Sequence, residues 1–449
     1  MMNLPDLSKK ISIIIPVHNA SSTLVQCLDA IKAVEYPVFE TILVDDSSTD
    51  GSMDIARYYP VKVLSLDEGP YGPGFARNRG ADIAEGAILF FVDADVLVKP
   101  DTLQKVADAF AKNPDISALF GSYDETPGSG EFLSQYKNLV HHFVHQQSRE
   151  EAVTFWSGCG AIYKEPFLKL GGFNFQKYPR PSIEDIELGY RLTMSGHQIA
   201  LIKDIQVTHL KRWTLVGLIK TDVFSRAIPW TRLIMEDRNL PNDLNLSSSQ
   251  RLSALLILVM MGYILLHLFM KNFIFVPLWF SLFILVSSSW HLEQGSTLFH
   301  LKPVQAGFTW VLALFSGLLA FWAGLQAILV LTALLLLFLL VGHLIGGGQH
   351  AIQRVLYIGM MWSMVAGLVI LFITYPLSFS LPVLILLGGV VFINQRLYRF
   401  LMRIRGGFFS LAAIPFQIFY YLYSVAAFGF VSGNFFWDQH FKPRMSKSV

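Results

Sequence analysis

The stretch that decides the fold is FFVDADVLVKPD, residues 90–101. Three large apolar residues begin it, as expected of a buried strand, and two carboxylates, Asp93 and Asp95, follow on either side of Ala94. Carboxylates beside a buried strand are costly unless they are paired, hydrogen-bonded or bound to a cation. Because residues i and i+2 of an extended chain point to the same side, both acids can face one cation or one polar ligand.

Strands and helices are expected to alternate around this stretch. The strand candidates are ISIIIPVHN (11–19), FETILVDD (39–46) and VKVLSL (61–66), and the helix candidates are VQCLDAIKA (25–33) and the end of GPYGPGFARNRGADIAEG (69–86). This alternation predicts a mostly parallel α/β sheet, a Rossmann-like arrangement in which ligands bind beyond the carboxyl ends of the strands.

Acids stand at two of those strand ends. Asp45 and Asp46 end one strand, and Asp93 and Asp95 end another. Hard oxygen ligands of this kind suit Mg²⁺ or Mn²⁺, usually shared with the phosphates of a substrate. The alternative for each acid is a helix cap or a turn, and for Asp45–Asp46 taken alone a helix N-cap is the better interpretation.

The second half of the chain has a different composition. Overall the chain is 53% hydrophobic and 15% charged with a mean hydropathy of +0.46, and beyond about residue 248 it consists of long apolar runs. This predicts a soluble domain followed by a membrane domain of about six crossings. The apolar segments approaching bilayer length are 252–270, 273–290, 306–322, 325–342, 355–373 and 378–394.

The arginines after the sixth segment indicate its orientation. They are Arg396, Arg399, Arg403 and Arg405, and with a cytoplasmic start they lie on the cytoplasmic side, as the positive-inside tendency requires. The last apolar stretch, 407–431, contains Pro415 and leaves two alternatives open. A seventh crossing would place the basic tail outside, whereas a re-entrant or interfacial hairpin, which we favour, would keep it inside.

A segment between the halves, TLVGLIKTDVFSRAIPWTRLIM (214–235), has apolar residues at helical spacing and charged residues elsewhere on the wheel. It predicts an amphipathic helix at the membrane surface, broken at Pro229. The alternative is an ordinary helix packed on the soluble domain. The expected division is therefore a cytoplasmic domain at 1–212, an interfacial linker at 213–248 and a transmembrane domain at 249–449.

Other features limit the function. The first residues have no long apolar run before a small-residue cleavage site, so we expect no signal peptide. The two cysteines, Cys27 and Cys159, make a disulfide framework improbable and favour a reducing compartment. A net charge of +2 gives no indication of nucleic acid binding.

The order of the motifs carries more information than any one of them. IIPVHN, LVDDSSTD, GxxxARNRG, FFVDAD, a Gly-rich segment and IEDIELGYRL follow one another within residues 10–235, and this order resembles the family 2 glycosyltransferases with a GT-A fold. The resemblance implies a metal-dependent enzyme that transfers a sugar from a nucleotide-sugar donor with inversion of the anomeric configuration. UDP is the expected nucleotide.

The resemblance also implies roles for the strand-end residues. Residues expected to bind the nucleotide or its sugar are Pro16, His18, Asn19, Asp45, Asp46, Arg77 and Asp93. The divalent cation, Mg²⁺ or Mn²⁺, is expected on Asp93 and Asp95. In IEDIELGYRL, Asp185 is expected to be the general base that takes the acceptor proton, with Glu184 beside it tuning its pKa.

Two further segments are expected near the site. FWSGCGAIYK (155–164) corresponds in position to the sugar-binding loop of the family. VTHLKRWTL (207–215) is similar in position to the QxxRW motif of membrane-bound members, with His209 in place of the Gln. The resemblance implies that Arg212 and Trp213 approach the diphosphate and the acceptor, and that His209 is a metal or diphosphate ligand.

The leading hypothesis is therefore a glycosyltransferase of the inner cell membrane that acts in building the cell envelope on a lipid or lipid-linked acceptor. A processive polysaccharide synthase is the alternative in the same class, although His209 in place of Gln and Ile183 before Glu184–Asp185 depart from that pattern. A membrane protein with a non-catalytic sugar-nucleotide domain is the alternative from another class. The sequence does not specify the sugar, the acceptor or the oligomeric state.

Overall fold

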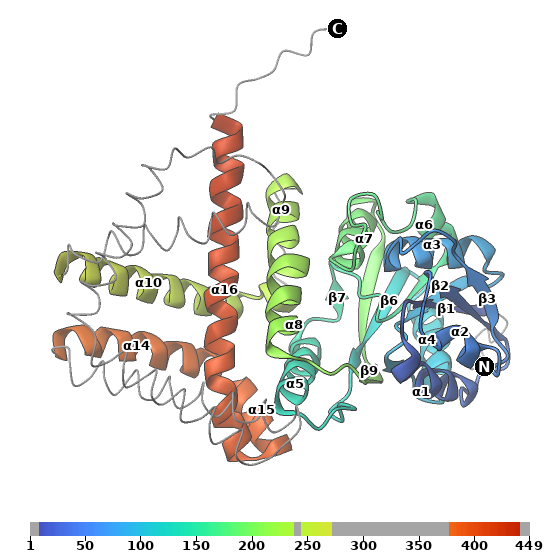
Figure 1. Cartoon of the computed structure of the whole chain (residues 1–449), viewed down its shortest axis with the longest axis horizontal. Coiled ribbons are helices and arrows are strands. Elements are labelled where there is room, and N and C mark those ends of the chain that lie inside the picture. Colours follow the sequence, from blue (N-terminus) through green and yellow to red (C-terminus); the bar gives the residue numbers. More distant parts are fainter. Residues whose placement is uncertain (1–8, 238–243, 272–376, 441–449) are drawn as a thin grey trace, which may run out of the picture. The chain divides into compact units, whose positions relative to one another are not determined.

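The computed structural model describes residues 9–237, 244–271 and 377–440 (Figure 1). The chain divides into two compact units. The first contains the residues up to Arg251, together with Arg396–Ala413 and the described part of Tyr423–Val449. The second contains the described part of Leu252–Gln395 and Ile414–Leu422. The break at Arg251 lies close to the boundary expected at residue 248, but Arg396–Ala413 belong to the first unit.

A mixed sheet forms the centre of the first unit. Its strands, within the described residues, are β1 (Ile11–Val17), β2 (Phe39–Asp45), β3 (Lys62–Ser65), β4 (Ile88–Val92), β5 (Val96–Leu97), β6 (Ile116–Tyr123), β7 (Glu151–Ala152), β8 (Cys159–Tyr163) and β9 (Gln198–His209). Their order is β3-β2-β1-β4-β8-β6-β9-β5, with β7 paired to β9. The expected parallel sheet is found in β1 to β4, whereas β8 is antiparallel to both of its neighbours.

Helices cover both faces of this sheet (Figure 1). They are α1 (Ser21–Lys32), α2 (Ser52–Ala56), α3 (Pro73–Ile83), α4 (Thr102–Lys112), α5 (Phe132–Gln147), α6 (Lys164–Lys169) and α7 (Glu184–Met194). Side chains alternate along β1, so Ile13 joins the core shared with α1 and α4, while Ile14 joins the core shared with α3, α6 and α7. Both faces of the central strands are buried, which explains their continuous apolar runs.

The segment after the sheet is one helical run. It consists of α8 (Leu215–Lys220), a π-helical segment (Thr221–Ala227) and α9 (Ile228–Asp237), so the break expected at Pro229 is not found. A π-helical turn directly precedes this proline, which has no backbone N–H to donate. Leu233 packs in a cluster with Tyr190 of α7, and the indole N–H of Trp230 donates to the Tyr190 hydroxyl (3.1 Å). Part of the apolar surface of this helical run therefore packs on α7, while Val216 and Phe224 stay exposed.

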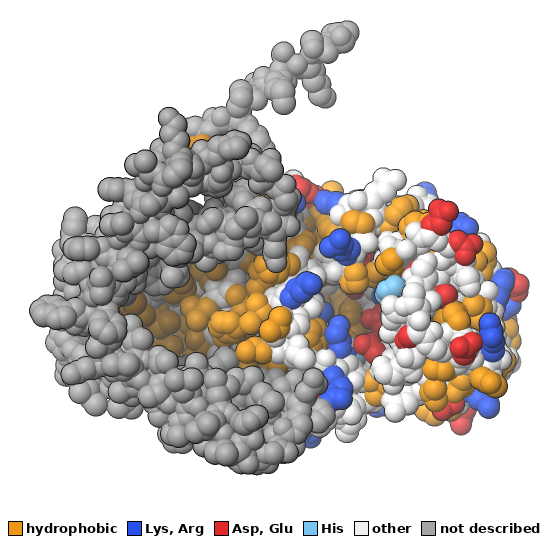
Figure 2. Space-filling model, in the orientation of Figure 1, with side chains coloured by type: hydrophobic (Ala, Val, Ile, Leu, Met, Phe, Trp, Pro, Cys, Tyr) orange, Lys and Arg blue, Asp and Glu red, His pale blue; other side chains and the backbone are white. Residues whose placement is uncertain are grey.

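Three of the four remaining long helices in the described residues, α10 (Ser248–Lys271), α14 (Leu377–Ile393) and α16 (Gly407–His440), are mostly apolar, and hydrophobic side chains form an exposed orange surface beside the grey part of Figure 2. The fourth is the arginine-rich α15 (Gln395–Arg405), and a short 3₁₀ turn, Leu244–Leu246, precedes α10. Within the second unit, α10, α14 and α16 share an apolar core. Asn394 links them, because its amide donates to the Ser253 hydroxyl (3.0 Å) and accepts from the Tyr421 hydroxyl (2.8 Å).

Two described helices, over Ser248–His267 and Gly407–Gln439, are long and apolar enough to cross a membrane, and a third candidate arises if α14 and α15 form one bent span. The expected segments 252–270 and 378–394 are helical, while 273–290, 306–322, 325–342 and 355–373 lie outside the described residues. The hairpin favoured for 407–431 is wrong, because α16 is a single helix of 34 residues. Pro415 removes only one N–H donor and lies in its third turn, so the helix continues beyond it.

Gly189 tests the packing that positions α7. A Cβ at this position would lie 2.4 Å from the backbone nitrogen of Phe155 and 2.6 Å from Thr154. Backbone atoms cannot yield as a side chain does, so we expect Gly189→Ala to destabilise the first unit by about 1–3 kcal/mol. Thermal unfolding of the purified chain measures this. Gly51→Ala is the matched control, since nothing lies within 4 Å of a Cβ there; equal melting temperatures for the two variants would contradict the packing.

Candidate active site

The acids and the residues after β1 meet at one edge of the sheet. β1 pairs in parallel with β2 on one side and with β4 on the other, so the carboxyl ends of all three point the same way. His18 and Asn19 follow β1, Asp46 follows β2, and Asp93 follows β4. This is the edge at which open α/β sheets bind ligands.

The carboxylates after β2 hold the backbone around them. Asp45 accepts from the Ser48 N–H (3.0 Å), as in a turn. Asp46 accepts from the N–H groups of Tyr71 (2.8 Å) and Gly72 (2.7 Å), which shapes the loop entering α3. Both side chains are buried. The turn-forming alternative from the sequence is therefore realised, and their contact with a nucleotide stays a prediction.

The residues after β1 line the same edge. Pro16 is half-buried, and His18 and Asn19 are exposed beyond it. Asn19 has a φ of 52° and accepts from the Thr49 N–H (2.8 Å), which ties this turn to the one after β2. The backbone carbonyl of Asp46 accepts a hydrogen bond from the Nδ1 of the His18 ring (2.7 Å).

Arg77 of α3 joins the two groups of acids. Its guanidinium is 4% exposed and contacts Asp93 (2.5 Å) through Nη2 and Glu184 (3.4 Å) through Nη1. Asp93 follows β4, whereas Glu184 begins α7, so one buried cation connects the D-x-D segment with the Glu–Asp pair. The sequence pattern placed Arg77 only on the donor side, because no local signal links residues 107 apart.

Glu184 is buried and Asp185 is half-buried at the start of α7. Burial and the neighbouring Asp185 charge raise the pKa of Glu184 to about 7, although Arg77 opposes this. Burial also raises the pKa of Asp185, while hydrogen bonds from the N–H groups of Ser157 (3.1 Å) and Ile186 (2.9 Å) stabilise its ionised form. Carboxyls with raised pKa values beside a cation are suited to moving a proton near neutral pH.

Asp95 pairs with His209 at the end of β9. The Asp95 Oδ2 lies 3.5 Å from the His209 Nε2, and the His209 Nδ1 lies 2.6 Å from the Asn138 Oδ1. Burial works to raise the pKa of Asp95, but the hydrogen bond and charge of His209 outweigh it and lower this pKa. Since an amide oxygen only accepts, Nδ1 carries a proton, and Nε2 is directed at the carboxylate.

These two groups suit a shared cation. A carboxylate oxygen and an imidazole nitrogen that a second hydrogen bond orients are ordinary ligands for Mn²⁺ or Mg²⁺. In the part of the chain that the structure describes, no three His, Cys, Asp or Glu side chains are grouped so as to hold a metal. A cation at Asp95 and His209 would therefore need further ligands from the substrate, as Mg²⁺ commonly has from phosphates.

Several residues around Asp95 and His209 belong to no motif recognised in the sequence. The Tyr123 ring stacks on His209 with centroids 4.3 Å apart, and its edge meets Trp156 at 4.8 Å. Asn138 of α5 orients His209. The segment 155–164 was expected near the site, and its Ser157 indeed contacts Asp185. A strand-end tyrosine and a helical asparagine give no distinctive spacing, so only the fold reveals them.

Arg212 and Trp213 follow β9 and contact residues at the start of α5. Arg212 is 59% exposed and pairs with Glu131 (2.6 Å). Trp213 is buried, its backbone N–H donates to Ser134 (2.8 Å), and the Lys211 ammonium lies 4.5 Å from its ring centroid. A role for either at a diphosphate stays a prediction; for the Trp213 ring, burial makes a packing role the one observed.

Residues 12–171 match the family model described as glycosyl transferase family 2. This range contains β1 to β8 and the acids after β2 and β4, and it ends before Glu184 and Asp185.

Curated relatives match over parts of their length. The poly(ribitol-phosphate) beta-glucosyltransferase of Bacillus spizizenii is 34% identical over 184 residues, which are 39% of this chain and 28% of that protein. The poly(ribitol-phosphate) beta-N-acetylglucosaminyltransferase TarS of Staphylococcus aureus is 27% identical over 201 residues, 43% of this chain and 34% of that protein. The chain thus spans about a third of the length of these relatives.

A solved structure, the mannosyltransferase PcManGT from Pyrobaculum calidifontis in complex with GDP-Man and Mn²⁺, is 20% identical with a TM-score of 0.42, over 56% of this chain and 72% of that one. The family match rests on the segment that forms the parallel half of the sheet and its acid-bearing edge. Residues 12–171 therefore resemble glycosyl transferase family 2 domains, and they form most of an α/β unit built on a mixed sheet.

Proposed function

We propose that this chain is a metal-dependent, inverting glycosyltransferase that moves a sugar from a nucleotide-sugar donor to a membrane-associated acceptor. One observation carries the proposal: the buried guanidinium of Arg77 pairs with both Asp93 of the D-x-D segment and Glu184, which is the neighbour of Asp185. Donor-side and acceptor-side acids thus face a common site. The family 2 match of residues 12–171 supports the same reaction class.

The proposed reaction assigns each of these acids one role. The acceptor oxygen attacks the anomeric carbon while its proton passes to Asp185, and the bond from that carbon to the diphosphate oxygen breaks with its electron pair leaving on the diphosphate. Backbone hydrogen bonds from Ser157 and Ile186 hold the Asp185 carboxylate in place before the proton arrives. A direct displacement of this kind inverts the anomeric configuration.

Asp95 and His209 are proposed to hold the divalent cation, and Asn138 fixes the His209 ring. Asp93, whose carboxylate pairs with Arg77, is proposed to contact the donor. When bound, Mg²⁺ or Mn²⁺ supplies charge stabilisation to the departing diphosphate. Arg212, which is 59% exposed and pairs with Glu131, is proposed to turn toward the oxygens of the departing diphosphate. The residues proposed to line the nucleotide, which is expected to be UDP, are Pro16, His18, Asn19, Asp45 and Asp46.

A membrane-associated acceptor is proposed from the apolar helices. α10 and α16 are candidate spans, and α10 exposes leucines such as Leu255 and Leu258 at about half of their surface (52% and 51%). A catalytic domain over 1–212 facing the cytoplasm, a linker over 213–248 and a membrane part over 249–449 stay our proposed division. Since relatives are named for poly(ribitol-phosphate), we propose a lipid or lipid-linked envelope glycan as acceptor.

Asp185 decides the catalytic proposal. Membranes containing the chain are screened with a set of nucleotide sugars, and lipid products are identified by mass spectrometry. We expect Asp185→Asn to slow transfer by about 100-fold or more, since an amide cannot take the proton, while donor binding is retained. Asp54→Asn, which changes an exposed carboxylate, is the control. Transfer by Asp185→Asn at the wild-type rate would remove this residue from the reaction.

His209 tests the metal site. Chelation of divalent cations is expected to stop transfer, and Mg²⁺ or Mn²⁺ to restore it. His209→Gln should raise the cation concentration needed for half-maximal transfer by about 10–100-fold, because a ligand is replaced by a weaker one. The control is His197→Gln, whose ring bonds Ser117 (2.8 Å). An unchanged cation requirement for His209→Gln would exclude it as a ligand.

Glu184 gives the stability a pH dependence of known sign. Its pKa of about 7 lies above the ordinary 4.5, so the folded chain binds its proton more tightly than the unfolded chain. The stabilisation is complete below about pH 4.5 and is lost as the pH rises through 7, by at most about 1.4 kcal/mol per pH unit. Melting temperatures should therefore fall more steeply between pH 5 and 8 for the wild type than for Glu184→Gln. Glu165→Gln is the control, and parallel curves for Glu184→Gln and the wild type would refute a raised pKa.

A further inference from the structure

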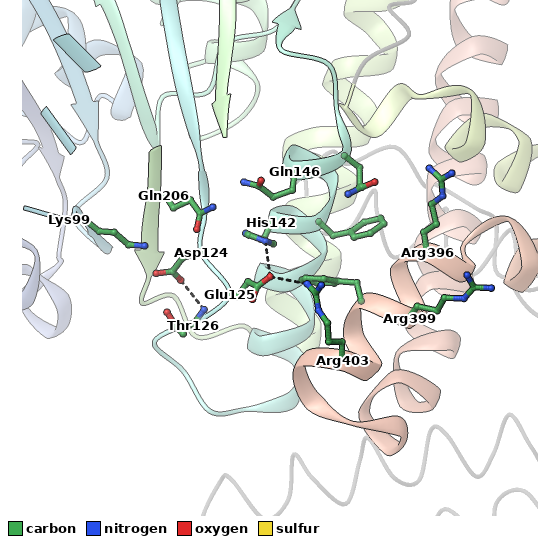
Figure 3. A pocket seen from close by; sticks show the side chains of 13 residues that line it. Lys99, Asp124, Glu125, Thr126, His142, Gln146, Gln206, Arg396, Arg399 and Arg403 are labelled. Atoms are coloured by element: carbon green, nitrogen blue, oxygen red, sulfur yellow. Dashed lines mark hydrogen bonds and ion pairs between the residues drawn. The ribbon is translucent and has the colours of Figure 1, made fainter. Parts of the chain in front are cut away.

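A cavity lies in the first unit, between α5 and α15 (Figure 3). Its volume is about 730 Å³. The lining side chains come from the segment after β6, from α5, β9 and α15, and from Lys99. Figure 3 labels Lys99, Asp124, Glu125, Thr126, His142, Gln146, Gln206, Arg396, Arg399 and Arg403. None of the site residues discussed above is among them.

One wall of this cavity is cationic. Arg396, Arg399 and Arg403 follow one another at i, i+3 and i+7 on α15, so they share one face of the helix. Leu397 and Leu401 are buried on another face. The sequence assigned these arginines only to membrane orientation, whereas the fold gathers them around a cavity.

The wall is fixed in place by contacts within the first unit. The Phe400 ring stacks on His142 with centroids 5.6 Å apart and meets Phe143 at 5.5 Å. Arg405, at the end of α15, donates to the Gln135 side chain (2.7 Å) and to the Glu125 carbonyl (3.1 Å). α15 is therefore held against α5 by side chains that do not depend on a ligand.

The acids of the cavity are already engaged. Asp124 accepts from the Thr126 N–H (3.0 Å) and from the Thr208 hydroxyl. Glu125 faces both His142 (3.5 Å) and Arg403 (3.4 Å). Within the described residues, Lys99 and Arg396 form no ion pair, so the cations of the cavity exceed the acids available to them.

The amide groups of Gln146 and Gln206 donate to the Lys203 carbonyl (3.1 and 3.2 Å), and their oxygens can accept from hydroxyls. Together with the excess of cations, this fits an oxyanion that also offers hydroxyls. Arginines on a fixed helix face are suited to phosphate in particular. We propose that the cavity binds the phosphate of an anionic phospholipid headgroup. The source of the phosphate follows from the chain order: α15 lies directly between the apolar helices α14 and α16, at the depth where lipid headgroups meet water if those helices enter a bilayer.

The proposed lipid site is distinct from the catalytic one. Successive residues of a strand point to opposite faces, so Asp124 and Thr208 face away from Tyr123 and His209, which stack beside Asp95. A ligand bound at Arg399 therefore lies on the opposite side of the C-terminal ends of β6 and β9 from Asp95. Its binding does not depend on the proposed transfer reaction, and it is measured without a sugar donor.

The test uses the full chain in neutral detergent. Short-chain phosphatidylglycerol and, separately, glycerol phosphate are titrated, and binding is followed by the rise in melting temperature. Each arginine near an anionic headgroup contributes about 1 kcal/mol, a factor of roughly five. We therefore expect Arg399→Gln with Arg403→Gln to weaken phosphatidylglycerol binding by roughly 25-fold, and Lys99→Gln, outside α15, by roughly fivefold.

The matched control removes the same charge elsewhere: Arg57→Gln with Arg79→Gln, whose side chains pair with Asp54 and Asp82 on exposed helix surface. Phosphatidylglycerol binding that falls in the cavity variants and not in the control supports the proposal. Saturable binding of glycerol phosphate with none of the lipid would overturn the lipid source in favour of a soluble phosphate ester. Equal lipid binding by wild type, cavity variants and control would overturn the site.

Discussion

The buried guanidinium of Arg77 is the interaction on which the rest of the α/β unit depends. A charge that is 4% exposed is tolerated only with counter-ions, and here they come from the end of β4 and the start of α7. Asp93 and Glu184 would repel each other without it. Breaking a buried pair of this kind commonly costs about 3–5 kcal/mol, so α3, β4 and α7 are held in one arrangement by the same groups that form the site.

Much of this could be predicted from local pattern. Carboxylates after apolar runs indicated the strand ends, and the parallel pairing of β1, β2 and β4 follows from strands that alternate with helices. Asp45 and Asp46 showed the limit of that reasoning, since both proved to shape turns as well. An N-cap, a turn and a ligand contact all use the same residue type, so the pattern cannot choose between them.

The rest required contacts between distant parts of the chain. Asn138 and His209 are 71 residues apart, and neither spacing nor composition predicts that a helix amide orients a strand-end imidazole. The continuity of α16 was missed for another reason. Pro415 is a strong local signal for a break, but losing one hydrogen bond near the start of a 34-residue helix leaves the remaining turns intact.

The ion pair between Lys137 and the buried Asp222 bears on the order in which the chain is made. Asp222, in the π-helical segment, contacts Lys137 (2.6 Å) and accepts from the hydroxyl of Tyr423 (2.5 Å), which is 201 residues further along. A ribosome that has completed the α/β domain has not yet made one of the partners of this carboxylate. The same holds for Glu125, whose Arg403 is also made late. The first unit therefore reaches its final hydrogen bonding only after the last helix has been synthesised, so truncated chains carry an incompletely satisfied catalytic unit.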